Sequence, residues 1–234
     1  MTTESKNTRP PVALVTGGSA GLGLALVAAL ADRGWQVITD GRDADRLRRA
    51  TADLPVRAIA GDVRSAAHRA RLADAVEELG RLDLLVHNAS ELGPMRTLAE
   101  SPAYGLADVF ATNVEAPLEL SRLLLPHLLH SDGILLSVSS DAAVEHYGTW
   151  GLYGASKAAL DHVTLTFGAE TGVTAYAVDP GDMRTAMHQQ AFPGEDISDR
   201  PLPGTVVPHL LALLTERPAS GRYRAAELAP AVAS

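Results

Sequence analysis

The sequence VALVTGGSAGLGLALVAALA, residues 12–31, decides the fold because it joins a short apolar strand, a glycine-rich turn and an apolar helix. Residues 12–16 have the composition of a buried strand, and the helix ends near Arg33 and Gly34. Glycines let the backbone come close to a pyrophosphate, and the start of the helix aims N–H groups at it. The stretch therefore predicts a dinucleotide phosphate site, with tight packing of helix on sheet as the alternative reason for the glycines.

Strand-like and helix-like segments alternate outward from this unit along the chain. Further short strand-like runs occur at residues 36–40, 56–60, 83–87, 133–140 and 173–178, and residues 221–224 could add a last short strand. Such alternation predicts a parallel sheet, because each strand returns through a helix. We expect one α/β domain over residues 1–234, with residues 1–10 flexible. Its architecture would be a Rossmann-like doubly wound parallel sheet of about seven strands with helices on both faces.

The composition excludes several classes of protein. The 234 residues are 46% hydrophobic, which suits one large core, and the absence of cysteine excludes disulfides and thiolate metal sites. A net charge of −8 gives no basic footprint for nucleic acid or for an anionic membrane. No apolar run approaches the roughly 18 residues that cross a bilayer, and residues 1–11 lack the apolar core of a signal peptide. We expect a cytoplasmic protein without a metal site.

The second predicted strand should end beside the adenosine ribose of the cofactor. If it ended one residue early, Asp40 would accept hydrogen bonds from the ribose hydroxyls and select NAD(H). If Gly41 occupied the strand end, Arg42 could hold the 2′-phosphate of NADP(H). We favour the second register and therefore NADP(H), with NAD(H) as the alternative.

Two side chains in residues 153–167 form the centre of the predicted chemistry. Tyr153 and Lys157 are four residues apart in a helical pattern, so they share one helix face. An adjacent ammonium favours the phenolate, which would move the pKa of the phenol toward neutral pH. Ser140 ends the apolar run before this helix, where its hydroxyl could reach a substrate oxygen. A solvated helix pair and an ordinary strand end are the alternatives.

Other polar residues follow predicted strands or interrupt predicted helices. Asp62 could cap the helix after it or meet the adenine edge, and Asn88 could form a turn or face the cofactor. Asn113 lies inside a helical pattern, where asparagine is unfavourable, so it either faces solvent or has a local polar role. Residues 182–204 lack periodicity, and a loop of this length in a compact domain indicates a lid over a binding site.

Taken together, these residues resemble the classical short-chain dehydrogenase/reductase family over nearly the whole chain. The glycine motif of residues 16–23 is similar to the family's cofactor motif. The resemblance is also carried by Asp62, Asn88-Ala89, the tetrad Asn113, Ser140, Tyr153 and Lys157, and Pro180-Gly181 with Thr185. The chain departs from the family's usual pattern at His87 and Ser90, and Ala20 stands where many NADP(H) users carry a basic residue.

The resemblance implies an oxidoreductase that interconverts a carbonyl and a secondary alcohol on a small or medium organic substrate. Tyr153 would be the general acid/base, and Ser140 would orient the substrate oxygen. Lys157 would hold the nicotinamide ribose and lower the tyrosine pKa, while Asn113 would fix a proton-relaying water. The alternatives are a 3-oxoacyl thioester reductase and a catalytically idle dinucleotide-binding sensor or assembly protein.

The resemblance also implies a set of binding residues and partners. The expected cofactor-binding residues are Gly17, Ser19, Ala20, Gly21, Leu22, Gly23, Gly41, Arg42, Asp62, Val63, Asn88, Ala89, Tyr153, Lys157, Pro180, Gly181, Met183 and Thr185. The expected substrate pocket comprises Ser140, Ala142, Tyr147, Trp150, Met187 and Phe192. Acidic residues in the segment 182–204 disfavour docking of an acidic carrier protein, so we expect a free small-molecule partner, and a homodimer or homotetramer.

Overall fold

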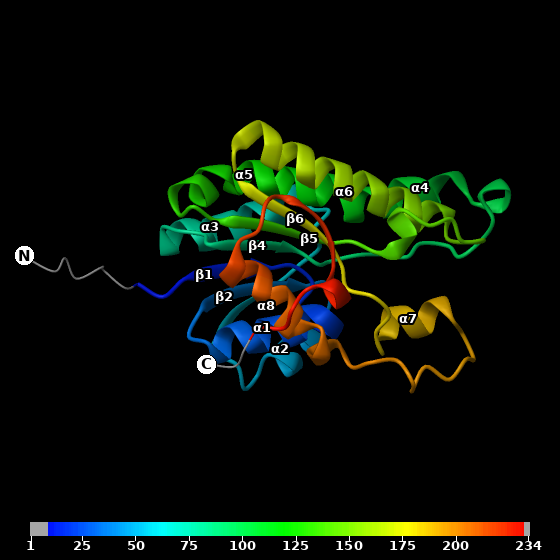
Figure 1. Cartoon of the computed structure of the whole chain (residues 1–234), viewed down its shortest axis with the longest axis horizontal. Coiled ribbons are helices and arrows are strands. Elements are labelled where there is room, and N and C mark those ends of the chain that lie inside the picture. Colours follow the sequence, from blue (N-terminus) through cyan, green and yellow to red (C-terminus); the bar gives the residue numbers. More distant parts are fainter. Residues whose placement is uncertain (1–8, 232–234) are drawn as a thin grey trace, which may run out of the picture.

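Seven strands form one parallel sheet, in the order β3-β2-β1-β4-β5-β6-β7 (Figure 1). The computed structural model describes residues 9–231, so residues 1–8 of the segment expected to be flexible lie outside the described residues. The strands are β1 Val12–Val15, β2 Gln36–Gly41, β3 Val56–Ala60, β4 Leu84–His87, β5 Ile134–Val138, β6 Thr174–Asp179 and β7 Gly221–Arg224. The strand order reverses direction between β1 and β4, which confirms the predicted doubly wound sheet.

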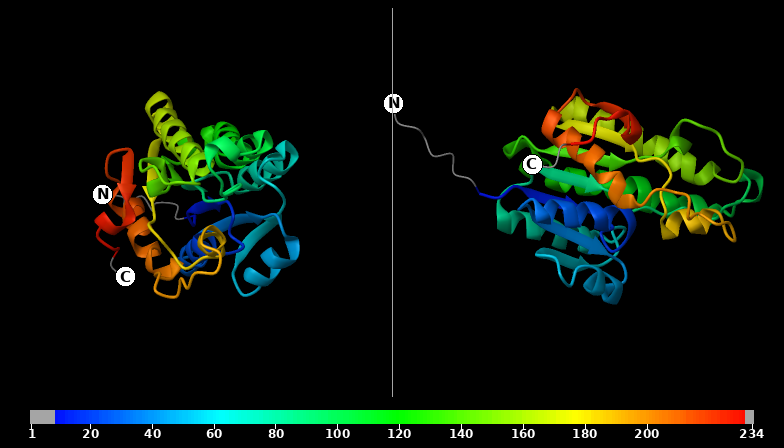
Figure 2. Two further views of the ribbon diagram at one scale, coloured as in Figure 1. Left: turned by 90° about the vertical axis from the view of Figure 1, so that its right-hand side faces the viewer. Right: turned by 60° about the horizontal axis from the view of Figure 1, so that its bottom comes forward.

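Helices cover both faces of this sheet (Figure 2). One face carries α1 Gly21–Asp32, α2 Ala44–Ala50 and α8 Val207–Glu216, and the other carries α3 Ala66–Leu79, α5 Ala116–His130 and α6 Gly151–Thr171. Two further helices, α4 Ala103–Phe110 and α7 Ala186–Ala191, lie near the carboxyl ends of the strands. Across residues 9–231, no helix is both long and apolar enough to cross a membrane.

Each strand contributes side chains to two cores, one on each face. Ala13 and Val15 of β1 pack against α1 and α8, whereas Val12 and Leu14 pack with the core of α3, α5 and α6. All four residues are buried. Strands covered on both faces are apolar throughout, which is why these runs show no polar alternation in the sequence. The sheet edge left open for ligands is the one formed by the carboxyl ends of the strands.

The helical pattern in which Asn113 lies is divided into three segments. Helix α4 is followed by a π-helical turn, Ala111–Glu115, which leads directly into α5. A π turn accommodates an extra residue and is frequent at functional sites. It contains Asn113, which is fully buried, so the solvent-facing alternative for this residue is wrong.

Residues 182–204, expected to lack regular structure, contain the six-residue helix α7. Thr185 caps this helix by accepting a hydrogen bond from His188 N at 3.1 Å. The backbone N–H of Arg184 donates to the carbonyl of Pro201 at 2.8 Å, which joins the two ends of the segment. Figure 1 shows the segment, coloured yellow to orange, projecting beyond the carboxyl ends of the strands.

His87 ends β4 inside the protein rather than at its surface. Its side chain is 3% exposed, and Nε2 lies 2.8 Å from the hydroxyl of Ser121 on α5. Burial disfavours the charged imidazolium and lowers the pKa of His87 to about 3. The unfolded chain therefore binds more protons than the folded one below the ordinary histidine pKa, and stability is lost as the pH falls.

We expect His87→Asn to reduce the acid sensitivity of the fold, because asparagine can meet Ser121 without a titrating ring. Between pH 7 and pH 5 the wild type should lose about 2 kcal/mol more unfolding free energy than the variant. Urea unfolding at the two pH values measures this difference. Equal losses in both proteins would show that His87 does not carry the acid sensitivity.

Candidate active site

A pocket of about 700 Å³ lies at the carboxyl ends of the strands. It is lined by the glycine loop after β1, by the ends of β2, β4, β5 and β6, and by α6 and α7. This is the edge where open parallel sheets bind ligands, at the point where the strand order reverses. The pocket brings together residues that are far apart along the chain.

The glycine loop needs its glycines for two different reasons. Gly17 and Gly21 have positive φ values of 72° and 56°, a region that favours glycine. A Cβ at Gly23 would lie 2.3 Å from Asn88 Nδ2 and 2.4 Å from the carbonyl of Gly17. Gly17 and Gly21 line the pocket, together with Ser19, Ala20 and Leu22. Gly23 does not line it and instead permits close packing beneath the loop.

The first turn of α1 has no side-chain cap, since Ala20 occupies the cap position. Its free N–H groups and the loop backbone form the kind of cradle that binds a pyrophosphate. Asn88 holds this cradle from β4, because its amide donates to the carbonyls of Thr16 and Gly17 at 2.9 and 3.2 Å. Asn88 and Ala89 also line the pocket. The residues therefore fit a dinucleotide.

Asp40 lies at the pocket wall, but it is buried under the glycine loop and both of its carboxylate oxygens are bonded within the protein. Its side chain is 1% exposed, and one carboxylate oxygen accepts from Gly17 N at 2.7 Å. The other oxygen lies 2.8 Å from Nε2 of the buried His68 on α3. The hypothesis of an acid that selects NAD(H) is therefore wrong for Asp40, which holds the loop to β2.

Arg42 follows the end of β2 and lines the pocket, because the strand extends to Gly41. Its side chain is 60% exposed, and its guanidinium lies 3.8 Å from the carboxylate of Glu91. Arg46, on the first turns of α2, lines the same corner of the pocket. We did not predict Arg46, because Arg42 lies before the helix cap Asp43 and the four-residue spacing of a helix face does not apply to the pair.

Asp62 lines the pocket beside Val63, but it does not cap α3. Ser65 is the cap, since its hydroxyl accepts from His68 N. The carboxylate of Asp62 accepts hydrogen bonds from the Arg64 guanidinium at 2.7 Å and from Arg64 N at 2.9 Å. Burial alone would raise the pKa of Asp62, but these bonds outweigh it and the net pKa is lowered.

Tyr153 and Lys157 meet on one face of α6 and both line the pocket. The ammonium lies 5.6 Å from the centre of the phenol ring. Lys157 Nζ donates to the carbonyl of Val138 at 2.8 Å, which orients the ammonium toward the end of β5. Both side chains are buried, so the alternative of a solvated helix pair is wrong.

Burial shifts the two groups in opposite directions. Burial raises the pKa of Tyr153 to about 12, with Asp141 and Asp179 adding to the rise while hydroxyls of Ser140 and Ser90 oppose it. It lowers the pKa of Lys157 to about 8. The pKa of the phenol is therefore raised rather than lowered in this structure, because desolvation outweighs the hydrogen bonds that favour the phenolate. At neutral pH the phenol holds a proton that it can donate.

Ser140 follows β5 and lies beside Tyr153 at the pocket wall. Its hydroxyl donates to the Asp141 carboxylate at 3.0 Å and accepts from Ala142 N at 3.2 Å. Asp141 also accepts from the hydroxyl of Tyr147 at 2.9 Å. A carboxylate thus lies directly behind the serine that was predicted to contact the substrate.

Asn113 does not line the pocket, and its side chain is fully engaged within the protein. Its oxygen accepts from Glu91 N at 2.9 Å and from Ser90 Oγ at 3.2 Å. Its amide nitrogen donates to the carbonyl of Glu91 and to Ser156 Oγ, both at 2.9 Å. An amide side chain makes four such bonds at most, so it has none left to fix a water. Its role here is to join the β4 loop to α6.

The predicted substrate residues divide into two groups. Ser140, Trp150 and Met187 line the pocket, and Ala142, Tyr147 and Phe192 do not. Ala142 is buried in a small cluster with Leu92 and Tyr153. Phe192 packs against the ring of Trp150 in a tilted arrangement, with 5.8 Å between ring centres. These side chains support the wall rather than form its surface.

The segment after β6 supplies another part of the lining. Pro180, Gly181, Met183 and Thr185 line the pocket, as expected. Sequence reasoning missed further lining residues, among them Ser90, Glu91, Leu92, Asp141, Asp182 and His188. Several of these adjoin residues that were predicted, so proximity along the chain was the available signal.

The comparisons with known proteins agree with this geometry. A family model described as short chain dehydrogenase matches residues 11–196. The uncharacterized oxidoreductase YciK of Escherichia coli K12 is 32% identical, over 87% of this chain and 85% of its own. A short chain dehydrogenase of Shigella flexneri, solved as a complex with NADP, is 31% identical and superposes with a TM-score of 0.85, covering 92% of this chain and 97% of its own.

A second solved structure is similar. It is a short chain dehydrogenase of Escherichia coli CFT073 complexed with NADPH, 31% identical, with a TM-score of 0.84 over 92% of this chain and 96% of its own. A parallel sheet with a glycine loop and a Tyr-Lys pair at its carboxyl edge defines an oxidoreductase of the dinucleotide-binding fold. The chain belongs to the short chain dehydrogenase family, as its sequence predicted.

We expect Asp40→Ala to destabilise the protein without changing its choice of coenzyme. The variant loses two hydrogen bonds of a buried carboxylate, so its unfolding free energy should fall by about 3 kcal/mol. The ratio of NADPH to NADH affinity should stay at the wild-type value. Asp45→Ala, which removes an exposed carboxylate of α2, serves as the control for stability. A change in the coenzyme ratio of Asp40→Ala would contradict this role.

Proposed function

We propose that the protein is an NADP(H)-dependent oxidoreductase that interconverts a carbonyl and a secondary alcohol on a small or medium organic substrate. The observation that carries the proposal is the convergence of Ser140, Tyr153 and Lys157 on the pocket that the glycine loop also lines. Phosphate-binding backbone and a buried acid thus share one pocket. Small concave sites with a few convergent polar groups are typical of small-molecule substrates.

NADPH, when bound, supplies the hydride that adds to the carbonyl carbon of the substrate. The loop of residues 17–22 would hold its pyrophosphate, and the residues 180–185 would lie over its nicotinamide. Tyr153 donates its proton to the substrate oxygen, so that one hydride and one proton convert the carbonyl to an alcohol. Ser140 holds that oxygen, and the ammonium of Lys157 stabilises the negative charge left on the phenol.

The preference for NADPH rests on the corner beside Gly41. Arg42 and Arg46 line it, and two basic side chains can hold a 2′-phosphate that NADH lacks. The Shigella flexneri and Escherichia coli relatives carry NADP and NADPH in their structures, which supports the same choice here. Arg42 also lies 3.8 Å from the carboxylate of Glu91, whose negative charge it would offset beside a phosphate.

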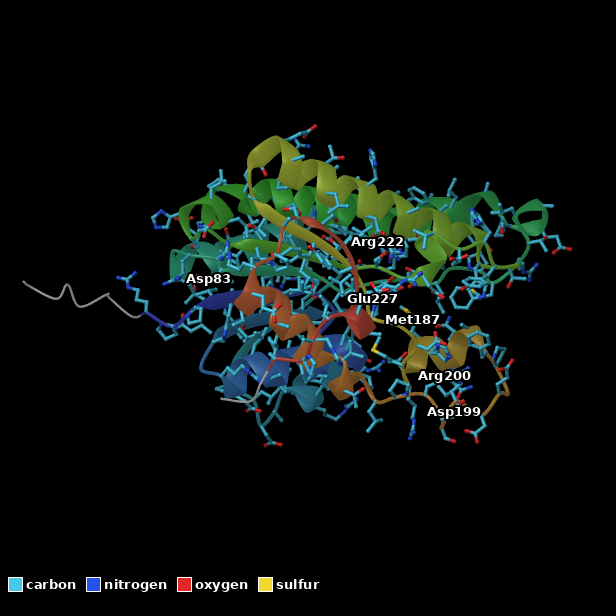
Figure 3. The ribbon with its side chains drawn as sticks, viewed as in Figure 1. Asp83, Met187, Asp199, Arg200, Arg222 and Glu227 are labelled. Atoms are coloured by element: carbon cyan, nitrogen blue, oxygen red, sulfur yellow. The ribbon has the colours of Figure 1, made fainter. Side chains whose placement is uncertain are left out.

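The segment 182–204 is proposed to act as a lid over the substrate. Met183, Met187 and Ala191 from this segment line the pocket, and Met187 is labelled on α7 in Figure 3. Asp182 and His188 add polar groups to the same side. Cytoplasmic location and assembly into a homodimer or homotetramer stay predictions.

Tyr153→Phe should lower the rate of carbonyl reduction by about a thousandfold, because the only change is loss of the proton donor. Its affinity for NADPH should stay within about twofold of wild type, since the ring remains in place. A panel of aldehydes, ketones and diketones with NADPH absorbance as readout supplies the substrate. Tyr223→Phe, an exposed hydroxyl remote from the pocket, is the matched control.

Substantial reduction by Tyr153→Phe would remove the phenol from the mechanism. A panel in which wild type binds NADPH and reduces nothing would favour the idle sensor or assembly protein instead.

Arg42→Ala should weaken NADPH binding about tenfold, because one charge-assisted contact to the 2′-phosphate is lost. NADH binding should change by less than about twofold, since NADH has no phosphate there. Fluorescence titration with both coenzymes measures the two constants. Arg48→Ala is the matched control, because this exposed arginine of α2 pairs with Asp45 instead. Parallel weakening of both coenzymes in Arg42→Ala would contradict a phosphate contact.

A further inference from the structure

Arg222 of β7 reaches across the sheet to the end of β5 (Figure 3). Its Nη2 donates to the carbonyl of Ser140 at 2.8 Å, and its Nε donates to the Asp161 carboxylate at 3.0 Å. Nη2 also lies 3.7 Å from the carboxylate of Asp179 at the end of β6. One guanidinium therefore joins the end of β5 and α6, which carry the reacting groups, to the end of β6. All three partners are distant from Arg222 along the chain. Only Asp179 lies on a strand, β6, that pairs with β7.

This arrangement is largely shielded from water. The side chains of Arg222, Asp161 and Asp179 are 21%, 11% and 7% exposed. Removing one partner of a buried ion pair strongly destabilises a protein, because the other partner is left as an uncompensated buried charge. The planar fork of arginine allows the bonds to Ser140 and Asp161 to form at once. The backbone of Ser140 is thereby fixed relative to α6.

Asp161 also faces Lys157, one helical turn earlier on α6. Burial raises the pKa of Asp161, whereas the Ser139 hydroxyl and Arg222 lower it. Its negative charge raises the pKa of Lys157, against the lowering by burial. Asp161 thus has a hydrogen-bonded cation in Arg222 and a second cation, Lys157, one turn earlier on its own helix.

The charged and titratable groups around Lys157 come from four elements. They are Tyr153 and Asp161 on α6, Asp141 after β5, Asp179 on β6, and Arg222 on β7. Asp161 is the carboxylate of this set that acts directly on the ammonium. Asp141 and Asp179 act on the phenol and raise its pKa.

We propose that Arg222 and Asp161 are positioning residues for the reductase reaction. Arg222 fixes the backbone of Ser140 at the end of β5, and Asp161 keeps the buried Lys157 ammonium charged. This inference rests on the proposed function, because Ser140 and Lys157 have to be positioned only if they take part in the reduction. Neither Arg222 nor Asp161 lines the pocket.

The lysine content of the chain allows a direct test without a substrate. Lys6 and Lys157 are its only lysines, so Lys6→Arg leaves one lysine to observe. In this background, lysine labelled with ¹³C at Cε gives one NMR signal whose shift follows protonation of the Lys157 amine. We expect a midpoint near pH 8, and Asp161→Asn should lower it by about one pH unit because the opposing charge is removed.

Glu170→Gln removes an equal charge from an exposed position of the same helix and should leave the midpoint unchanged. If Asp161→Asn titrates at the wild-type pH, Asp161 does not support the ammonium and the proposal is wrong. Asparagine can still accept a bond from Arg222, so this variant keeps the shape of the pair.

The role of Arg222 is tested by turnover with a carbonyl that the wild type reduces. Arg222→Gln should lower kcat about tenfold, because Ser140 loses its anchor, with KM for NADPH unchanged. Arg222→Lys should recover part of the loss, since one charged bond can still form. Arg224→Gln is the matched control, because this arginine of the same strand lies 3.9 Å from Glu227 alone.

The measurements distinguish a failure of the positioning role from a failure of the proposed function. Equal kcat values for Arg222→Gln and Arg224→Gln would overturn the positioning role. If Arg222→Gln does not fold, the kcat of Arg222→Lys decides, and a wild-type value overturns the role. A wild type that reduces no carbonyl would overturn the proposed function, whereas the lysine titration still reports on Asp161 by itself.

Discussion

The site depends on the close approach of the glycine loop to the end of β4. Thr16 Oγ1 accepts from the N–H groups of Asn88 and Ala89 at 3.0 and 3.1 Å, so the two strand ends share one hydroxyl. A Cβ at Gly17 would lie 2.9 Å from Ala89 Cα, which leaves no room for any other residue. From the opposite side Asp40 holds Gly17 N. Three strands therefore fix the loop before any ligand arrives, which removes most of the entropy cost of ordering it on binding.

Burial of side chains at the pocket disfavours the charged forms of its titratable groups. Burial of the two side chains favours the neutral forms of both Tyr153 and Lys157, so it keeps the proton on the phenol and makes the ammonium easier to deprotonate. Charged neighbours have to restore what burial removes. The carboxylate of Asp161 does this for the ammonium, and the hydroxyl of Ser140 does it for the phenol. The pKa of each of the two groups is thus set by burial acting against its charged or hydrogen-bonding neighbours.

Local patterns predicted the fold and the phenol–ammonium pair, because strand and helix periods and a four-residue spacing act over short distances. Contacts between distant segments were not predictable. Whether Asp40 meets solvent depends on His68, which belongs to a different helix. The side chain of Asn113 is fully bonded within the protein, but its partners lie on a loop and a helix whose approach only the packed structure defines. The bond from Arg222 to Ser140 spans 82 positions.

The π-helical turn of residues 111–115 sets how far α5 is rotated about its axis relative to α4. Successive residues of an α-helix are turned by about 100°, so a single added or removed residue rotates everything after it by that angle. Deleting one residue here would restore ordinary helical hydrogen bonds, but it would turn the buried stripe of α5 away from the sheet or Asn113 away from its partners. The length of this turn is therefore constrained even where the identity of its exposed residues is not.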